Sequence, residues 1–394
     1  MKNLKRLIKE HVNKVYALFN FIRFLVNDLN KIKKCECLFF FPYYHTGGAE
    51  KVHVNILNAI NYKNCVVIFT MGSATKSFYN SFKNSAQVIE LNPILNKKSK
   101  WINNQLHKSI IKAINSSKNI ETIFGCNSSY YYQIIPGINK RIKKIDLFHA
   151  FEEDDSRILD IINSAKIVNK RIVINQKAKN DIIEFYRSNT IESQYIKNIK
   201  IIQNGIELAK NENYTKKENP IKIGFVGRWS AEKRPEFFLE IAKKIKNKLP
   251  NVEFVMVGTG MKSNIDLINN AEVAFLGEIT DKIKMAELYN SLHLILVTSV
   301  YEGFPMVIME AMSHGVIPIT TNVGGINDHI RHKENGLLID EIDEVAIIDR
   351  FCENILYLLN NQIEKNKISE SAFDYAKNQF GIDKFNQSYR NIFS

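Results

Sequence analysis

Cysteine is scarce and scattered in this chain of 394 residues. There are five, none in a Cys-x-x-Cys pair and none with a histidine nearby at metal-ligand spacing, at positions Cys35, Cys37, Cys65, Cys126 and Cys352. Their odd number and irregular spacing indicate reduced residues in a cytosolic protein and not a disulfide framework. The pattern also excludes a local zinc motif.

Long apolar runs are missing as well. No segment reaches the roughly 18 uninterrupted apolar residues that a membrane-spanning helix needs. No small-residue cleavage site follows the apolar stretch 15–26, so a secretory signal is disfavoured. A composition of 45% hydrophobic and 24% charged residues is typical of soluble globular proteins, and the length suits two domains.

The charge balance is strongly basic, with a formal net charge of +13. Such an excess favours anionic partners, namely nucleotides, phospholipid surfaces or nucleic acid, without choosing among them. The sequence contains no recognised nucleic-acid-binding module, so we predict no nucleic-acid partner.

Residues 1–34 differ from the rest of the chain. They hold nine basic and two acidic residues, a net +7. Apolar residues recur in steps of three and four, which predicts one apolar stripe on a long basic helix. The stripe consists of Leu4, Ile8, Val12, Val15, Phe19, Ile22, Val26 and Leu29. Two interpretations stay open: the helix lies in a membrane interface, or it packs on the first domain or on a partner chain.

The most informative stretch is 298–315. The apolar run 292–297 before it predicts a buried strand, Pro305 suits the first helical turn, and Gly315 suits the residue just past the helix end. We therefore predict a strand, a loop and a helix N-terminus, whose free backbone N–H groups favour an anionic ligand.

Two acids stand eight positions apart in this stretch. We predict Glu302 in the loop and Glu310 about two turns into the helix, so that they reach different parts of one extended ligand. Carboxylates pair well with sugar hydroxyls. The alternative is an ordinary strand–loop–helix unit with solvated acids.

Two other turns follow predicted strands. Gly47-Gly48-Ala49-Glu50 follows the strand 38–41, and paired glycines allow a close approach of backbone to a ligand. Arg228 and Lys233 follow the strand 221–226, where an arginine binds a diphosphate as a fork and a lysine as a point charge. Ordinary glycine turns and a solvated basic turn are the alternatives.

The segment Tyr-Glu-Gly-Phe-Pro-x-Val-x-x-Glu-Ala-Met at 301–312, followed by Gly315, Pro318 and the glycines of 323–325, resembles the donor-site signature of retaining glycosyltransferases of family 4, the glycosyl transferases group 1. The 47–50 loop is similar to the family's first-domain Gly-Gly-x-Glu loop. The resemblance covers nearly all of the chain after residue 35 and is strongest in 221–340.

The resemblance implies that Arg228 and Lys233, with the helix beginning near Pro305, stabilise a departing diphosphate. It implies that Glu310 holds the ribose and that Glu302 holds the donor sugar. The implied catalytic residues are Arg228, Lys233, Glu302 and His149, and the implied substrate-binding residues are Gly47, Gly48, Gly227, Gly303, Phe304, Pro305, Val307 and Glu310.

Some positions depart from the family pattern. The family often has His followed by Asp where this chain has His149-Ala150, so a plain loop histidine stays open as an alternative to a sugar-binding one. The resemblance implies no metal and no cofactor, the nucleoside diphosphate sugar being a substrate. The short Gly258-Thr259-Gly260 segment lacks the third glycine of a dinucleotide fingerprint, so a nicotinamide cofactor is disfavoured.

Apolar runs alternate with helical stretches along the chain, a pattern typical of parallel α/β sheets. With the resemblance, this predicts the GT-B fold, two Rossmann-like doubly wound domains facing a central cleft. The predicted parts are the basic helix 1–34, the first domain 35–207, a linker 208–220, the donor domain 221–365 and a C-terminal helix 366–394 crossing back to the first domain.

The implied function is retaining, metal-independent transfer of a hexose-type sugar from a nucleoside diphosphate sugar, most simply a UDP-sugar. The implied acceptor is a glycan or polyprenyl-linked glycan of bacterial surface polysaccharide, in the O-antigen, capsule or lipopolysaccharide class. We expect a cytoplasmic protein with peripheral contact to the anionic inner face of the plasma membrane. A catalytically silent nucleotide-sugar-binding subunit and a GT-B sugar-nucleotide epimerase stay open.

Overall fold

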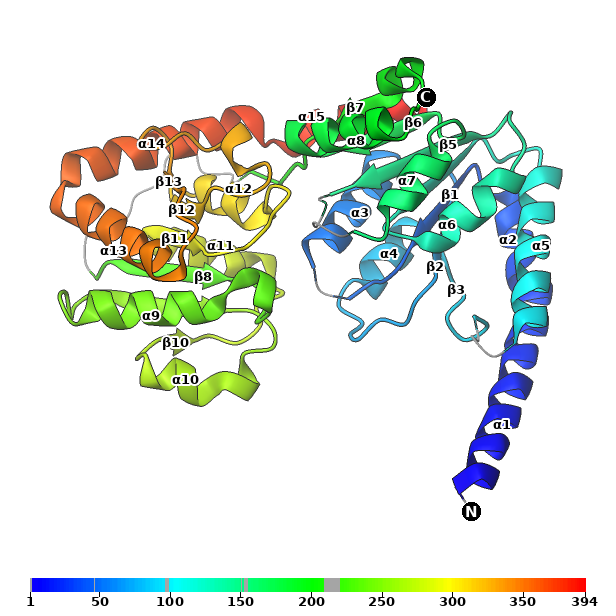
Figure 1. Ribbon diagram of the computed structural model, residues 1–394, viewed down its shortest axis with the longest axis horizontal. Coiled ribbons are helices and arrows are strands. Elements are labelled where there is room, and N and C mark those ends of the chain that lie inside the picture. The colour runs from blue at the N-terminus through cyan, green and yellow to red at the C-terminus, as the bar shows by residue number, and fades with distance from the viewer. Residues whose placement is uncertain (1, 46, 96–98, 150, 152–154, 209–219) are drawn as a thin grey trace. The chain divides into compact units, whose positions relative to one another are not determined.

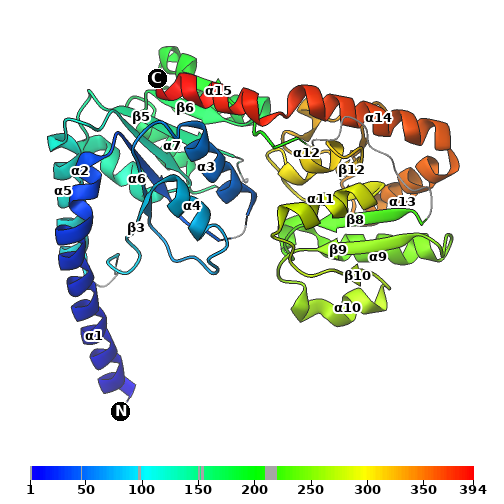
Figure 2. The same ribbon diagram turned by 180° about the vertical axis from the view of Figure 1, so that it is seen from behind.

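The computed structural model describes residues 2–45, 47–95, 99–149, 151, 155–208 and 220–394, with the backbone alone for residues 2–11. The chain divides into two compact units (Figures 1 and 2). The N-terminal unit comprises Met1–Ile174, Ala178–Ile202 and Phe385–Ser394, and the C-terminal unit comprises Asn175–Lys177 and Gln203–Lys384.

A seven-stranded parallel sheet forms the centre of the N-terminal unit, in the order β3-β2-β1-β4-β5-β6-β7. Every residue of β1 and β2 is buried, because a parallel sheet is covered by helices on both faces. The strands are β1 (Cys37–Phe41), β2 (Cys65–Phe69), β3 (Gln87–Glu90), β4 (Thr122–Cys126), β5 (Lys143–Phe148), β6 (Lys170–Val173) and β7 (Ile199–Ile201).

The C-terminal unit repeats this plan with a six-stranded parallel sheet in the order β10-β9-β8-β11-β12-β13. The strands are β8 (Lys222–Val226), β9 (Glu253–Val257), β10 (Ala274–Phe275), β11 (Leu294–Val297), β12 (Ile317–Thr321) and β13 (Leu337–Ile339).

Helices connect the strands and cover the sheets (Figure 1). In the first part of the chain they are α1 (Lys2–Arg23), α2 (Leu29–Lys34), α3 (Gly48–Ala59), α4 (Tyr79–Ser85), α5 (Lys100–Ser116), α6 (Ser129–Ile134), α7 (Ile158–Ser164) and α8 (Gln176–Ser188). In the second part they are α9 (Pro235–Lys246), α10 (Ile265–Asn270), α11 (Lys282–Ser291), α12 (Met306–Met312), α13 (Glu344–Asn360), α14 (Gln362–Gln379) and α15 (Ile382–Phe393).

Both sheets reverse their strand order once, between β1 and β4 in the first and between β8 and β11 in the second. This confirms the prediction of two Rossmann-like doubly wound α/β units. In such sheets the carboxyl ends of the strands at the reversal form the ligand-binding crevice. The loops after β1, β4, β8 and β11 are therefore the places to look for function.

The bounds of two predicted parts need correction. Residues 1–34 belong to the N-terminal unit and are not a separate part, and of the predicted tail 366–394 only Phe385–Ser394 joins that unit. The Nζ of Lys143 donates to the backbone oxygen of Ile392 at 3.1 Å, whereas α14 stays in the C-terminal unit. Most of the predicted linker 208–220 lies outside the described residues.

The helix predicted at 305–314 is shorter than expected. α12 begins at Met306, with Pro305 in an extended conformation as its N-cap, and it ends at Met312. Glu310 therefore lies little more than one turn into the helix, not two. A helix this short has a weak dipole, so an anion site here depends on the side chains around the helix.

The N-terminal helix packs through residues that are not part of the predicted stripe. Ala17, Phe21 and Phe24 are buried in the core of the N-terminal unit, together with Ile32 of α2. A five-residue π-helical segment, Phe24–Asp28, separates α1 from α2. Among the described residues, no helix is long and apolar enough to cross a membrane.

Candidate functional site at the carboxyl ends of the parallel strands

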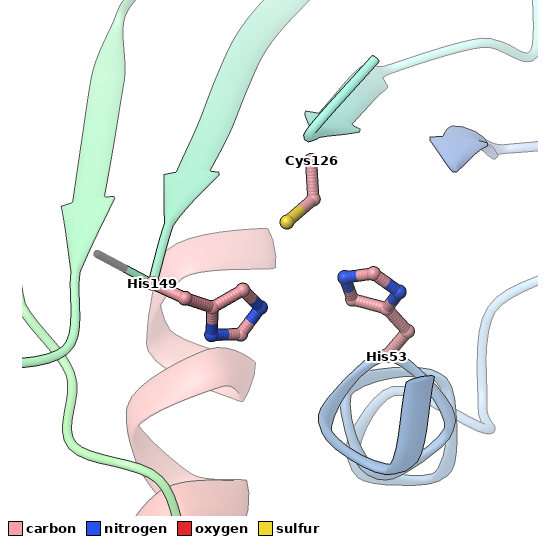
Figure 3. Close-up of side chains that lie close together, drawn as sticks. All are labelled: His53, Cys126 and His149. Carbon is pink, nitrogen blue, oxygen red and sulfur yellow. The ribbon is translucent and has the colours of Figure 1, made fainter. Parts of the chain in front are cut away.

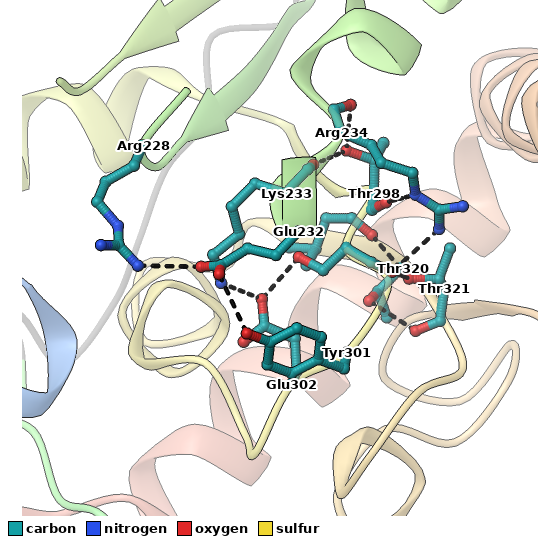
Figure 4. A network of polar contacts seen from close by, with 11 residues as sticks. Arg228, Glu232, Lys233, Arg234, Thr298, Tyr301, Glu302, Thr320 and Thr321 are labelled. Atoms are coloured by element: carbon teal, nitrogen blue, oxygen red, sulfur yellow. Dashed lines mark hydrogen bonds and ion pairs between the residues drawn. The ribbon is translucent and has the colours of Figure 1, made fainter. Parts of the chain in front are cut away.

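In the C-terminal unit, the loops after β8 and β11 meet through Lys233 and Glu302 (Figure 4). The Nζ of Lys233 lies 2.5 Å from the Oε1 of Glu302, and the Oγ of Ser299 donates to the same oxygen at 2.7 Å. The Glu302 side chain is only 9% exposed, so this pair fixes its carboxylate more firmly than a surface ion pair would.

Arg228 stands beside this pair and is half exposed. Its Nη2 donates to the Oε1 of Glu232 at 3.0 Å, and the hydroxyl of Tyr301 donates to the other oxygen of Glu232 at 3.2 Å (Figure 4). A guanidinium carries five N–H donors in a planar fork, so this contact leaves donors for an anion.

Arg234 and Thr298 hold the two loops together, and sequence reasoning missed both. Arg234 has a left-handed backbone with φ +46°, placed just before Pro235 opens α9. Its Nε donates to the backbone oxygen of Thr298 at 2.7 Å, and the Oγ1 of Thr298 donates to the backbone oxygen of Lys233 at 2.6 Å. These bonds set the position of Lys233 relative to the β11 loop.

The glycines of the 323–325 motif lie directly behind the Glu302 loop. A Cβ on Gly324, whose φ is +62°, would lie 1.6 Å from the backbone oxygen of Glu302. The backbone N–H of Gly325 and the side-chain amide of Asn175 both donate to the backbone oxygen of Gly303 at 2.9 Å. The motif is thus required for close packing of the site loop.

A similar contact supports Gly227. A Cβ on Gly258, whose φ is +141°, would lie 1.7 Å from the backbone oxygen of Gly227. The backbone N–H of Gly227 donates to the backbone oxygen of Val257 at 3.0 Å. This turn therefore requires a residue without a side chain at Gly258.

Glu310 is oriented by Tyr289 of α11, which the sequence did not single out. The Tyr289 hydroxyl donates to the Oε2 of Glu310 at 2.8 Å. Burial, with the neighbouring Glu310 carboxylate, raises the pKa of Tyr289 well above its usual value, so the hydroxyl keeps its proton.

The predicted residues next to Glu302 differ in what they expose. Phe304 is buried, with its ring centroid 4.5 Å from that of His329 and 5.4 Å from that of Phe380, so only its backbone is available to a ligand. Gly303, Pro305 and Val307 are half-buried, and the Val307 side chain packs against an apolar cluster between β11 and α12.

In the N-terminal unit, the predicted glycine loop follows β1 and opens α3. Gly47 is the N-cap of α3, and the carboxylate of Glu50 folds back so that a Cβ on Gly47 would lie 2.2 Å from its Oε2. The Oε1 of Glu50 lies 3.7 Å from the Nε2 of His45. Gly48 is exposed, and nothing lies within 4 Å of where its Cβ would be. Thr46 lies outside the described residues.

His149 follows β5 and lies beside two side chains that are distant in sequence (Figure 3). Ligand atoms of His53, Cys126 and His149 lie within 4.8 Å of one another. Neither ring nitrogen of His53, nor the Nε2 of His149, has a hydrogen-bond partner in the described part of the chain. Burial lowers the pKa of His149 to about 4, with the charge of Arg157 adding to the effect.

These three residues are the one group of potential metal ligands among the residues that the structure describes. The guanidinium of Arg157, held by Asp155 and Asn127, lies near enough to act on both His149 and Cys126. Because its positive charge opposes a second cation, the group does not by itself mark a metal centre. Ala150 and the acids 152–154 lie outside the described residues.

The structure thus places the predicted residues in two groups. Arg228, Lys233, Glu302 and Glu310 gather at the β8/β11 reversal of the C-terminal unit, and Gly47, Gly48 and His149 lie at the strand ends of the N-terminal unit. The residues that sequence reasoning missed act through long-range contacts that no local motif announces. They are Ser299, Tyr289, Arg234, Thr298, Asn175, His53 and Arg157.

Residues 220–361 match the family described as Glycosyl transferases group 1. The match spans the whole of the Lys233–Glu302 site and Glu310. This segment is a group 1 glycosyl transferase domain.

Curated relatives agree with this assignment. The chain is 28% identical over 209 residues to UDP-Gal:alpha-D-GlcNAc-diphosphoundecaprenol alpha-1,3-galactosyltransferase of Escherichia coli, a match covering 47% of this chain and 51% of the relative. It is 23% identical over 358 residues to an uncharacterized glycosyltransferase of Haemophilus influenzae, covering 88% of this chain and 96% of the relative. The chain spans only about half the length of several relatives it matches.

Among solved structures, Anabaena HepE in complex with UDP and glucose is similar in fold, with a TM-score of 0.70 at 17% identity. The alignment covers 91% of this chain and 99% of that one. At this identity the likeness shows the fold, which is GT-B.

Proposed function

We propose that the group 1 domain binds a nucleoside diphosphate hexose, a UDP-sugar, and that the protein transfers the sugar to a hydroxyl group with retention at the anomeric carbon. The observation that carries this proposal is the Lys233–Glu302 pair at the β8/β11 reversal, with Arg228 next to it and Glu310 on the helix α12 that follows the Glu302 loop. Two bases next to two acids suit a diphosphate with a sugar on each side. The E. coli relative, whose name includes a UDP-sugar donor, supports the choice of UDP.

In the proposed reaction the acceptor oxygen forms a bond to the anomeric carbon while the bond from that carbon to the diphosphate oxygen breaks. The diphosphate leaves with the electron pair, and its departing oxygen takes up the proton that the acceptor hydroxyl gives up. Arg228 and Lys233 stabilise the charge that develops on the leaving group, as preorganised donors do in other enzymes. These two side chains take the place of a metal ion, so the reaction is metal-independent.

The other site residues have binding roles in this proposal. Glu310, oriented by Tyr289, holds the ribose hydroxyls, and Glu302 with the backbone of Gly303 and Phe304 holds the hexose. Gly227, Pro305 and Val307 shape the turns around the diphosphate. In the N-terminal unit, Gly47 and Gly48 let a ligand approach the backbone, and His149, neutral at neutral pH, hydrogen-bonds the hexose. No protein side chain is proposed as a nucleophile.

The proposed acceptor is a glycan or polyprenyl-diphosphate-linked glycan of bacterial surface polysaccharide. The E. coli relative, whose name includes a diphosphoundecaprenol-linked substrate, supports this class. Such a substrate places the protein in the cytoplasm, peripherally at the inner face of the plasma membrane.

A transfer assay tests the reaction. UDP-hexoses are incubated with a polyprenyl-diphosphate-linked sugar in the presence of EDTA, and the product is analysed by NMR for its anomeric configuration. We expect release of UDP with the donor's configuration kept, and at least about a hundredfold loss of rate in Lys233→Ala. A product of inverted configuration, or activity abolished by EDTA, would contradict the proposed mechanism.

A further inference from the structure

The N-terminal helix, made of α1 and the π-helical segment Phe24–Asp28 that continues it, has two apolar faces that point in roughly opposite directions. The first comprises Ala17, Phe21 and Phe24, all at most 6% exposed and part of the core of the N-terminal unit. This face attaches the C-terminal end of α1 to α5, which in both views lies beside α2 and that end of α1 (Figures 1 and 2).

The second face is exposed. It comprises Val12, Val15, Phe19, Ile22 and Val26, spaced by steps of three and four, with exposed fractions between 53% and 72%. We call these five residues the α1 stripe. Their spacing over 15 residues makes a continuous apolar line of roughly 20 Å along the helix. The partly exposed Tyr16, Leu18 and Leu25 flank the line.

Such a line is not ordinary surface. Isolated exposed apolar side chains are common on soluble proteins, but a contiguous row at helical spacing indicates a surface that binds another protein or a membrane. The part of the stripe predicted at Leu4 and Ile8 lies where only the backbone is described. The exposed face is thus the part of the predicted stripe from Val12 to Val26, whereas Leu29 at its end packs against the core. The buried face is a second one.

Charge identifies what covers the stripe. Residues 1–34 carry a net +7, more than half of the net +13 of the whole chain. A second copy of this helix would bring two such charges together, which repel each other. An anionic bilayer surface instead attracts each nearby Lys or Arg and accepts apolar side chains about 5–10 Å deep.

We propose that α1 lies in the interface of an anionic membrane, with the α1 stripe inserted among the lipids. The face formed by Ala17, Phe21 and Phe24 then attaches the N-terminal unit to this helix. This proposal rests on the proposed function, because a lipid-linked acceptor lies at the membrane surface. Membrane binding itself is measured without any turnover.

The test is co-sedimentation of the full-length protein with vesicles of phosphatidylcholine mixed with phosphatidylglycerol. The test variant carries Val15→Ser, Phe19→Ser and Ile22→Ser. The matched control carries Ile283→Ser, Val345→Ser and Ile363→Ser, three scattered apolar side chains of the C-terminal unit that are 62% to 83% exposed. Because all six side chains are exposed, both variants are expected to keep the melting temperature of the wild type.

We expect the wild type and the control to bind the mixed vesicles, more weakly at high salt and on pure phosphatidylcholine. We expect the stripe variant to bind at least about tenfold more weakly. Equal binding of the stripe variant, or no binding of the wild type at low salt, would overturn the proposal. So would a dimer in light scattering that the stripe substitutions dissociate, since the stripe would then be covered by a second copy.

The same samples separate this proposal from the proposed function. A thermal shift on addition of UDP reports on the C-terminal unit alone, and the stripe variant is expected to keep it in full. Loss of vesicle binding with an intact UDP shift supports the membrane role. Vesicle binding without any UDP shift in the wild type would remove the transferase proposal and leave the membrane surface standing.

Discussion

Two features of the structure require glycine at position 324. Its φ is +62°, and the backbone oxygen of Glu302 occupies the place where a Cβ would lie. Positive φ alone costs an alanine about 1–2 kcal/mol. The steric overlap adds displacement of the site loop to that cost. The two effects can be separated, because Gly277 has a φ of +79° with nothing within 4 Å of its Cβ position.

We therefore expect Gly324→Ala to weaken UDP binding by at least about tenfold, since it moves the backbone of Glu302 and with it the paired Lys233, which binds the diphosphate in our proposal. Gly277→Ala should lower the unfolding free energy by about 1–2 kcal/mol through backbone strain and leave UDP binding unchanged. Isothermal titration calorimetry and urea unfolding measure the two quantities. Equal UDP affinity in both variants would mean that the 323–325 turn does not support the site.

His329 is a second residue whose chemistry is set by its surroundings. It packs between Phe304 and Phe380, and its Nδ1 lies 3.1 Å from the Tyr375 hydroxyl. Burial lowers its pKa from 6.5 to about 4, while the charge of Asp328 acts weakly in the other direction. The imidazole is therefore neutral in the folded protein at neutral pH.

Because the pKa of His329 is lower in the folded state, the unfolded chain binds more protons between about pH 6.5 and pH 4. Stability is full above pH 6.5 and falls as the pH drops through this window. We expect about 2 kcal/mol of unfolding free energy to be lost from this residue at about pH 5. Between about pH 7 and pH 5, the free energy of unfolding measured with urea should fall less in His329→Gln than in the wild type. An equal fall in both proteins would show that another group titrates.

Sequence reasoning singled out the charged residues of the candidate site but not the residues that hold them in position. Lys233 and Glu302 stand in glycine-containing loops after apolar strands, and that local pattern was sufficient to select them. Arg234, Tyr289 and Ser299 look like ordinary surface or helix residues until the fold brings their partners close. Contacts of this kind depend on long-range packing, which local pattern does not encode.

At the scale of elements, strands were predicted well because both sheets are parallel and covered on both faces. The predicted strands 38–41, 221–226 and 292–297 agree with β1, β8 and β11 within two residues at either end. Helix ends were predicted less well. The chain leaves α12 at Ser313 and turns through Gly315 at φ +68°, so the sequence signal of Gly315 lies three residues beyond the last helical residue.

β5 and β6 are joined by a buried ion pair that no local pattern reveals. Asp146 is 0% and Arg171 1% exposed at the side chain, with Nη2 of Arg171 2.7 Å from Oδ2 of Asp146. The Tyr132 hydroxyl also donates to Asp146 at 2.9 Å, and Arg171 Nη1 donates to the Tyr186 hydroxyl at 2.7 Å. The pair is satisfied only while both charges are present.

We expect Asp146→Ala to destabilise the N-terminal unit by about 3–5 kcal/mol, since it leaves a buried guanidinium without its counter-charge. The matched control is Asp349→Ala, which removes an exposed partner of Lys244 and should cost at most about 1 kcal/mol. Urea unfolding followed by circular dichroism compares the two. Similar losses in both variants would contradict a special role for the buried pair.

At the scale of the whole molecule, the chain returns to the N-terminal unit at its end. The ring of Phe393 stacks on Phe39 and Phe124 at centroid distances of 5.6 and 5.8 Å, and Arg390 Nε donates to the backbone oxygen of Ala59 at 3.0 Å. The sequence predicted a returning helix but placed its start too early. The break falls at Phe380, whose carbonyl accepts from the backbone N–H of Ile206 at 2.8 Å, a partner far away in sequence.

Phe393→Ala is expected to cost about 3–5 kcal/mol in the unfolding of the N-terminal unit, because it opens a cavity between α15 and the sheet. Asn391→Ala, two residues earlier and exposed, is the matched control and should stay within about 0.5 kcal/mol of the wild type. Hydrogen exchange of the β1 and β4 backbone amides measures the loss of stability in the strands that Phe393 contacts. Unchanged protection in Phe393→Ala would show that the chain end does not stabilise this unit.

The central claim is that the C-terminal unit binds a nucleoside diphosphate sugar through Glu310 and its neighbours. A panel of nucleoside diphosphates and nucleotide sugars is tested by thermal shift on the wild type, on Glu310→Ala and on Glu353→Ala, whose exposed side chain lies on α13. We predict a rise in melting temperature with uridine nucleotides that Glu353→Ala keeps and Glu310→Ala loses. No shift with any nucleotide, or the same shift in Glu310→Ala, would contradict the claim.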